Sequence, residues 1–232
     1  MDAERNQDIS TKTDGRDRPK LVILAVLHMA QYFPAAFAGV ALPFLFRKEG
    51  LALELFWLLA LPGYTRFLKW LMALVVDNFG SRRIGRRKSW IIPCTAIGAM
   101  SYALLALFPP SLTALHIIVG ILIFKSFVMA AQDIAVDAYA AESMTDEERP
   151  LGTSLINYLG AIAGLLGTGA VIIVEFLGWA PTMLAASGLL VLAALPAIIR
   201  REPPPPDLVQ KRVARGDRPS FITVLKQRDS RL

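Results

Sequence analysis

Six long apolar runs limit the possible folds of this chain more than any other feature of its sequence. They cover residues 21–46, 52–76, 90–108, 112–132, 153–176 and 180–199. A helix needs about 20 apolar residues to cross a bilayer, and continuous apolar runs indicate helices, whereas barrel strands alternate. Hydrophobic residues make up 54% of the chain and charged residues only 19%, which is typical of a membrane protein. We predict an all-α membrane protein with six transmembrane helices in a lipid bilayer.

The Lys and Arg residues between the runs indicate the orientation of the chain. Five precede the first run, five lie between the second and third runs, and nine follow the last run. The opposite side has only Arg47 and Lys48. Because basic residues concentrate in cytosolic loops, we expect both termini in the cytosol, in a bacterial-type inner (plasma) membrane. This asymmetry explains the net charge of +6, so we predict no nucleic-acid partner.

Composition divides the chain into three parts. Residues 1–20 are polar and read as a cytosolic tail, residues 21–199 hold the transmembrane bundle, and residues 200–232 form a basic, Pro-rich cytosolic tail or linker. The single cysteine, Cys94, gives no metal-ligand spacing, and we expect no metal or cofactor. The sequence holds no zinc-protease motif, paired catalytic carboxylates or nucleophile elbow, so we predict that the protein is not an enzyme.

Polar residues are distributed unequally among the six runs. The first, second, fourth and fifth runs carry polar or charged side chains, whereas the third and sixth carry no charge within the membrane. This period of three predicts two three-helix repeats, in which the third helix of each faces lipid and the others line a cavity. The fifth run also holds glycines that allow another helix to approach closely. These glycines are Gly160, Gly164, Gly167 and Gly169.

Three cations lie near the middle of their runs, namely Arg66, Lys69 and Lys125. Each would cost about 2.5–3.5 kcal/mol in contact with lipid, so we expect all three to face an aqueous or protein interior. A cavity with several cations attracts an anionic solute, and Arg can bind a carboxylate bidentately. The predicted solute-binding residues are Arg66, Lys69, Lys125, His28, Gln31, Tyr32 and Gln132. Alternatively, the cations pair with carboxylates from other helices or from a partner.

Proton coupling needs a group that can gain and lose a proton within the membrane. Asp133 and Asp137, which are one turn apart, are the predicted coupling or charge-relay residues, and His28 is a further candidate. The alternative for the two carboxylates is that they anchor the basic loop between the second and third runs. For His28 the alternative is a hydrogen-bonded packing residue.

That basic loop resembles the signature of the major facilitator superfamily, a helix-ending Asp followed by Gly and then Gly-Arg-Arg. The corresponding residues are Asp77, Gly80, Gly85, Arg86 and Arg87, with Arg82 and Arg83 inside a four-residue insertion. The chain departs from the pattern at Ala73, where Gly is usual, and at Asn78, where Arg is usual.

Three further motifs resemble the subgroup that contains muropeptide permeases and single-component siderophore permeases. They are QYFP at 31–34, LALPGYTRFLKW at 59–70 and QDIAVDAYAAE at 132–142, the last of which is followed by Glu147, Glu148 and Arg149. The loop GSRRIGRRKSW is closer to the siderophore branch. The resemblance extends over about residues 21–206.

The resemblance implies a secondary active transporter that takes up an anionic solute such as a siderophore, driven by the proton gradient. It also implies that transport occurs by alternating access and that the basic loop gates the cytosolic side. A muropeptide, or another anhydro-sugar or acyl solute, is the alternative cargo. A non-transporting membrane remnant or scaffold is the alternative function. Because a full member has twelve spans, we expect the chain to be half of a carrier. It is then either a fragment or the partner of a second six-helix half, in a separate chain or a homodimer.

Overall fold

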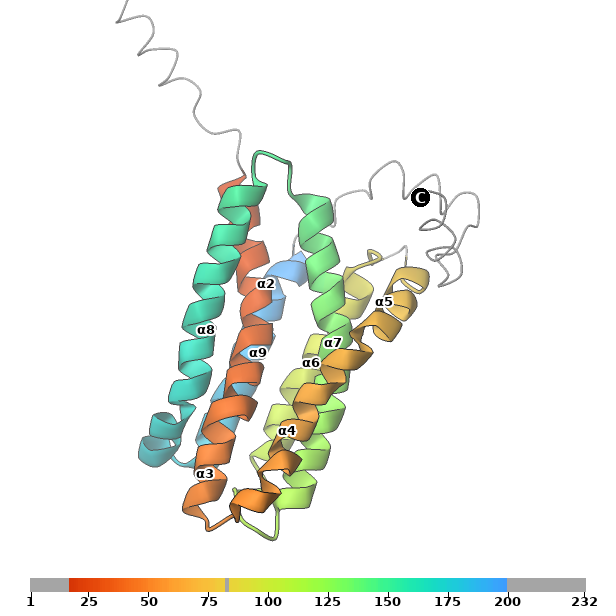
Figure 1. The fold of residues 1–232 in the computed structure, drawn as a ribbon. Helices are drawn as coiled ribbons and strands as arrows, with labels where there is room; N and C mark the ends of the chain where they lie inside the picture. Colours follow the sequence, from red (N-terminus) through yellow and green to blue (C-terminus); the bar gives the residue numbers. More distant parts are fainter. Residues whose placement is uncertain (1–16, 82–83, 200–232) are drawn as a thin grey trace, which may run out of the picture.

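The computed structural model describes residues 17–81 and 84–199, and the regular structure of this part is helical throughout. The prediction of an all-α protein is therefore confirmed. The helices run up and down in a bundle (Figure 1). In chain order they are α2 (Arg18–Ala36), the π-helical turn η1 (Phe37–Ala41), α3 (Leu42–Lys48), η2 (Leu53–Leu55), α4 (Phe56–Tyr64), η3 (Thr65–Leu68), α5 (Lys69–Asn78), α6 (Lys88–Leu105), α7 (Leu115–Ser143), α8 (Arg149–Leu177) and α9 (Trp179–Ile199).

Within the described residues, five continuous helical stretches are long and apolar enough to cross a membrane. They are Arg18–Lys48, Leu53–Asn78, Leu115–Ser143, Arg149–Leu177 and Trp179–Ile199. The predicted third span corresponds to α6, which has 18 residues and is not among the five. Polar residues such as Lys88, Thr95 and Ser101 lower its apolar character. Helix α7 also continues well beyond residue 132, because the segment that follows is rich in helix-forming alanine.

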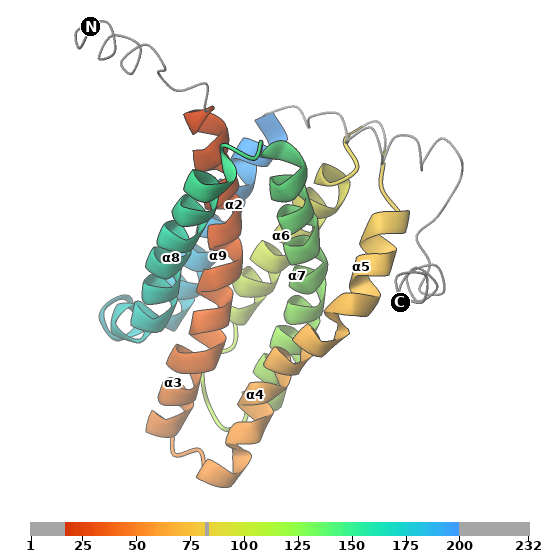
Figure 2. The same ribbon diagram turned by 45° about the horizontal axis from the view of Figure 1, so that its top comes forward.

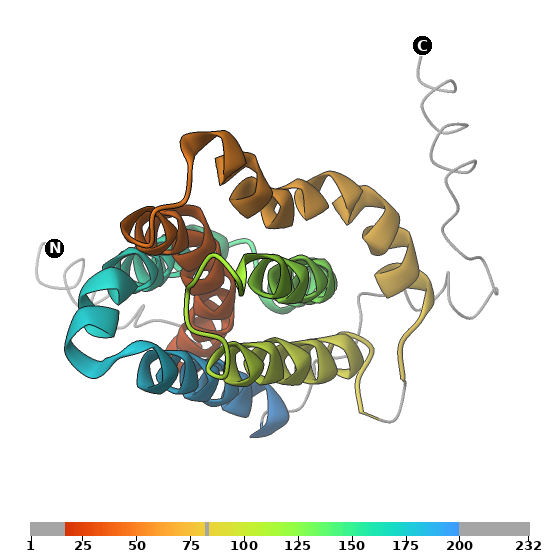
Figure 3. The ribbon, with the colours of Figure 1, turned by 90° about the horizontal axis from the view of Figure 1, so that it is seen from below.

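The views of the bundle agree on how the helices are arranged. Helices α6 and α9 lie side by side along one edge, α4 and α5 lie along the opposite edge, and α7 lies between these edges (Figure 3). The start of α2, the end of α5 and the connection from α7 to α8 are at one end of the bundle (Figures 1 and 2). Within the described residues, these three places are thus at a common end of the bundle.

Two prolines coincide with the irregular turns of the first two spans. Pro34 lies in α2 just before the wider turn η1, and Pro62 lies in α4 just before the 3₁₀ turn η3. Proline lacks a backbone N–H donor, so the regular hydrogen-bond ladder is interrupted near it. Thr65 Oγ1 donates to the carbonyl oxygen of Pro62 at 2.8 Å. Residues three apart eclipse in a 3₁₀ turn, which brings Arg66 and Lys69 onto one face.

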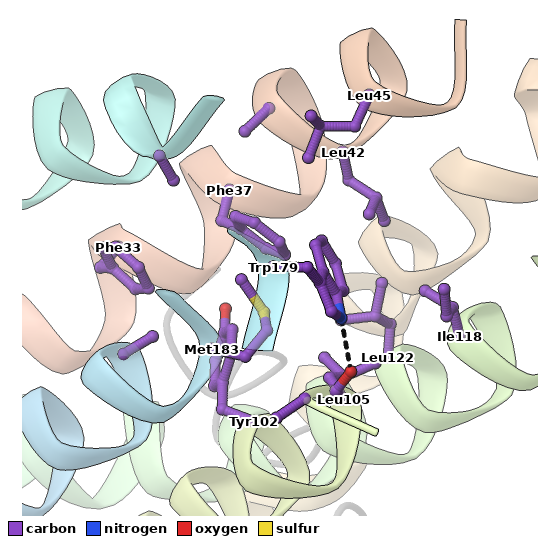
Figure 4. Close-up of a cluster of buried hydrophobic side chains, with 14 of the residues drawn as sticks. Phe33, Phe37, Leu42, Leu45, Tyr102, Leu105, Ile118, Leu122, Trp179 and Met183 are labelled. Atoms are coloured by element: carbon purple, nitrogen blue, oxygen red, sulfur yellow. Dashed lines mark hydrogen bonds between the residues drawn. The ribbon is translucent and has the colours of Figure 1, made fainter. Parts of the chain in front are cut away.

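A cluster of aromatic side chains joins the first span to α6 and α9 (Figure 4). Phe37 packs against Tyr102 and Trp179, with ring centroids 5.8 and 6.1 Å apart. Trp179 Nε1 donates a hydrogen bond to the carbonyl oxygen of Leu105 at 2.7 Å, which satisfies its buried N–H. The cluster fixes Tyr102, whose ring forms part of the surroundings of Lys125.

Helix α8 approaches α2 closely at two of its glycines. A Cβ atom on Gly167 would lie 2.5 Å from the carbonyl oxygen of Phe33, and one on Gly160 would lie 2.7 Å from the ring of Tyr32. Nothing lies within 4 Å of the corresponding position on Gly164 or Gly169. The predicted close approach is therefore confirmed at two of the four glycines.

Candidate functional site

A cavity of about 740 Å³ opens between the first, second and fourth spans. Its lining comes from α2, η1, α4, η3, α5 and α7, with Ile156 from α8, and includes no residue of α6 or α9. This volume is in the range of small-molecule sites in proteins. This arrangement agrees with the unequal distribution of polar residues among the six runs. The third and sixth runs carry no charge within the membrane, and the corresponding helices, α6 and α9, do not line the cavity.

Eight of the nine residues predicted to bind solute or couple protons line this cavity. They are His28, Gln31, Tyr32, Arg66, Lys69, Lys125, Asp133 and Asp137. Gln132 does not line it, which corrects its predicted position. At about 100° per residue, the cavity-lining residues of α7 span an arc of about 140° that begins at Lys125, and Gln132 lies about 20° outside it. Lys125 reaches the cavity through its long side chain, but Gln132 is 0% exposed, and its amide nitrogen and oxygen have no hydrogen-bond partner among the described residues.

Lys125 is buried in the cavity wall, with an exposed fraction of 2%. Its Nζ atom lies 3.5 Å from the hydroxyl oxygen of Tyr102 and 4.9 Å from the centroid of the Tyr102 ring. In the described part of the chain neither Lys125 nor Arg66 forms an ion pair with a carboxylate. Arg66 is exposed at the cavity. Two cations therefore face the cavity without an acidic partner from these residues.

The third cation, Lys69, forms an ion pair with Asp133 of α7. The alternative interpretation, pairing with a carboxylate from another helix, therefore describes Lys69 but neither Arg66 nor Lys125. Three basic side chains and two carboxylates line the cavity, so the basic groups are in excess. An anion is the solute that this excess favours.

His28 connects α2 to α7 and is 5% exposed. Its Nδ1 lies 2.8 Å from the carbonyl oxygen of Leu24, and its Nε2 lies 3.2 Å from Oδ1 of Asp137. A carbonyl oxygen can only accept, so Nδ1 carries a hydrogen, and a neutral ring would then turn the Nε2 lone pair toward a carboxylate. A hydrogen bond between Nε2 and Asp137 therefore requires one further proton, carried by either group.

The basic loop is held by carboxylates other than the two that we considered as anchors. Arg87 donates to Asp77 at 2.7 Å and to Glu142 at 2.8 Å, and Arg86 donates to the same Glu142 oxygen at 2.7 Å. Burial of Arg87 opposes its charge, but the hydrogen bonds and charges of Glu142 and Asp77 outweigh it and raise the pKa of the guanidinium. Glu142 ends the motif at 132–142, and its partners could not be found from sequence spacing. Arg82 and Arg83 lie outside the described residues.

Both glycines of the loop are required by its backbone. Gly85 has φ of +115°, a left-handed conformation that side chains disfavour. A Cβ atom on Gly80 would lie 2.8 Å from Cγ and 2.9 Å from the carbonyl oxygen of Arg86. The glycines thus allow the turn that brings Arg86 and Arg87 to Asp77 and Glu142.

A second polar cluster, centred on Glu148, connects the starts of α2 and α8. Lys20 Nζ lies 2.5 Å from Glu148 Oε2, and the backbone N–H groups of Asp17 and Thr145 donate to the same carboxylate at 3.1 and 3.0 Å. Burial disfavours the carboxylate, but the hydrogen bonds from Lys20, Thr145 and Asp17 and the charge of Lys20 outweigh it, and the pKa of Glu148 falls to about 2. This contact could not be predicted from residue spacing, because it joins residues 128 positions apart.

Comparison with known proteins places the chain in a family. Residues 24–230 match the sequence profile of the Major Facilitator Superfamily. The chain belongs to the major facilitator superfamily. This membership and the apolar helices identify an integral, multi-pass membrane protein. The predicted family resemblance is confirmed at this level.

Two other proteins share part of their sequence with this chain. The anhydromuropeptide permease of Escherichia coli K12 is 25% identical over 189 residues, which are 80% of this chain and 38% of the permease. An uncharacterized protein of Haemophilus influenzae is 29% identical over 150 residues, 65% of this chain and 35% of that protein. The chain thus spans less than two fifths of the length of these relatives. Of the two, the Escherichia coli protein is named as a permease.

Proposed function

We propose that this chain forms a six-helix half of a secondary active transporter that takes up an anionic solute by alternating access. In this proposal α6 is the third of six transmembrane helices, arranged as two three-helix repeats. Both termini face the cytosol at an inner membrane, and the proton gradient drives uptake. A second six-helix half, in a separate chain or a second copy, completes the solute path. The family membership and the common end at which α2 starts, α5 ends and α7 connects to α8 support this arrangement.

The observation that carries the proposal is the pair of cavity cations without a carboxylate partner in the described residues, Arg66 and Lys125. A cation inside a membrane protein costs several kcal/mol unless another group compensates its charge. A carboxylate of the solute supplies that compensation, and a hydrogen bond to a charged group contributes about 1.5–3 kcal/mol. The cavity is thus complementary to an acidic molecule.

An anhydromuropeptide is the first solute to test, because one relative is named as a permease for that class. An acidic siderophore, which the loop GSRRIGRRKSW favours by resemblance, is the second. Both classes carry acidic groups that Arg66 and Lys125 can bind. His28, Gln31 and Tyr32 of α2 supply further polar groups to the cavity lining.

Proton coupling is assigned to the carboxylates of α7. Asp137 shares a proton with His28, whereas Asp133 is neutralised by Lys69. The basic loop, held through Asp77 and Glu142, is the proposed cytosolic gate. These assignments rest on the geometry of the ion pairs and on the family resemblance of the loop.

Uptake of radiolabelled anhydromuropeptide and ferric siderophore, in cells that express the chain together with a second half, tests the proposal. Arg66→Ala and Lys125→Ala should each raise the half-saturating concentration about 10- to 100-fold at normal expression, since each removes one charged hydrogen bond. Lys48→Ala is the matched control, because Lys48 pairs with Glu175 outside the cavity. Unchanged transport in both cavity variants would refute the site. If no acidic solute is taken up or raises the unfolding temperature, the chain is a scaffold.

A further inference from the structure

Lys125 differs from the other cavity cations in how its charge is compensated. Lys69 has a built-in carboxylate partner in Asp133, and Arg66 is exposed. Lys125 is both 2% exposed and without a carboxylate partner among the described residues. An ammonium group removed from water needs a counter-charge, and the Tyr102 ring and hydroxyl supply only a partial one.

The surroundings of Lys125 contain few groups that could provide this counter-charge. Tyr102 of α6 contacts it directly. The other charged or titratable groups that line the cavity are on the first span, the second span and α7 itself, and none comes from α8 or α9. These groups are His28, Tyr32, Arg66, Lys69, Asp133 and Asp137. The two carboxylates among them contact Lys69 and His28.

We propose that Lys125 takes up a proton when it binds the anionic group of the solute, so that proton and anion occupy the cavity together. The inference rests on the proposed function. Nζ of the amine gains one proton from cavity water, and the resulting ammonium donates to the solute carboxylate. When the anion leaves, the ammonium again lacks a counter-charge and returns the proton to water. The N–H bond forms as an O–H bond of a protonated water molecule breaks, and release of the proton to water reverses both changes.

The neighbouring cavity cation cannot perform this step. A guanidinium does not lose its proton in proteins, so Arg66 binds an anion without any change in bound protons. The proton shared by His28 and Asp137 is also different, because both of its binding groups belong to the chain and are present without solute. Lys125 is therefore a proton site whose occupation depends on the solute.

Titration calorimetry in several buffers counts the protons that accompany binding, because each buffer contributes its own heat of ionisation. The sample is the chain with its second half in detergent, and the probe is an anhydromuropeptide with a free carboxylate. Wild type should take up about one proton per bound probe, and its affinity should fall about tenfold per pH unit in the alkaline range. Lys125→Arg should bind the probe with proton uptake near zero, since arginine stays charged. Lys48→Arg is the matched control, because Lys48 pairs with Glu175 outside the cavity, and it should keep the wild-type proton count.

The outcomes separate this inference from the proposed function. Probe binding by wild type without proton uptake, or Lys125→Arg with the wild-type proton count, would overturn the role of Lys125 and leave the transporter proposal standing. If Lys125→Arg does not fold, the pH dependence of wild-type affinity decides, and a flat profile rejects the inference. If wild type binds neither the probe nor an acidic siderophore, the proposed function fails, and the inference fails with it.

Discussion

The contact between α2 and α8 at Gly167 can be tested with a single methyl group. In Gly167→Ala the new Cβ would lie 2.5 Å from the carbonyl oxygen of Phe33, 3.0 Å from Cβ of Ala36 and 3.1 Å from the backbone nitrogen of Phe37. Two of these three atoms belong to the backbone, so a rotamer change cannot relieve the clash and the helices must separate. Inserting a methyl group into a packed interior typically costs about 1–3 kcal/mol.

Gly164→Ala, one turn away on the same helix, is the control because nothing lies within 4 Å of its added Cβ. Both variants gain the same helix propensity, about 1 kcal/mol, so their difference isolates the clash. Gly167→Ala should therefore be less stable than Gly164→Ala by about 1–3 kcal/mol, which corresponds to an unfolding temperature lower by about 2–12 °C. Thermal unfolding in detergent measures this difference. Equal unfolding temperatures would refute the described packing of α8 on α2.

Two further predictions concern the polar clusters at the same end of the bundle. The pKa of Glu148 is lowered from 4.5 to about 2, so its contribution to stability is present above pH 4.5 and is lost as pH falls toward 2. Glu148→Gln should therefore lower the unfolding temperature at pH 6. Between pH 6 and pH 3 the unfolding temperature of this variant should fall less than that of wild type, and a melting series measures both. An equal fall in the two proteins would contradict the assignment. Arg87→Lys cannot bridge both Asp77 and Glu142, so its effect should be non-additive with Glu142→Gln in a double-mutant cycle of unfolding free energies. Strict additivity would mean that this ion pair contributes nothing.

The helical fold and the charged residues that line the cavity could be predicted from the sequence because the bilayer restricts both. Spanning helices need long apolar runs, and a charged side chain such as Arg66 or Lys125 must avoid lipid. These two constraints are local and can be applied one run at a time. They led to an all-helical bundle, and eight of the nine residues predicted from them line the cavity. The predicted position of Gln132 was wrong because the prediction used only the angle of each residue around α7. It did not consider that a Lys side chain is longer than a Gln side chain.

The pairing of the polar residues could not be predicted, since it depends on how separate helices are arranged. Nothing in the sequence distinguishes Lys69, which pairs with Asp133, from Arg66, which has no acidic partner among the described residues. The same limit applies to Glu148, whose partner Lys20 is 128 positions away. Glycine spacing was likewise insufficient, because the rotation of α8 decides which glycines face α2.

Helix α7 contributes polar contacts to several other parts of the described bundle. Its polar side chains contact a different neighbour at successive heights: Lys125 contacts Tyr102 of α6, Asp133 contacts Lys69 of α5, Asp137 contacts His28 of α2, and Glu142 contacts Arg86 and Arg87 before α6. Within a bilayer the hydrophobic effect does not drive helices together, so such contacts and close packing determine the arrangement. Lys125, Asp133 and Asp137 of this helix line the cavity, and Glu142 binds the basic loop. A change in charge at Asp133 or Asp137 therefore acts on the cavity lining and on helix packing together.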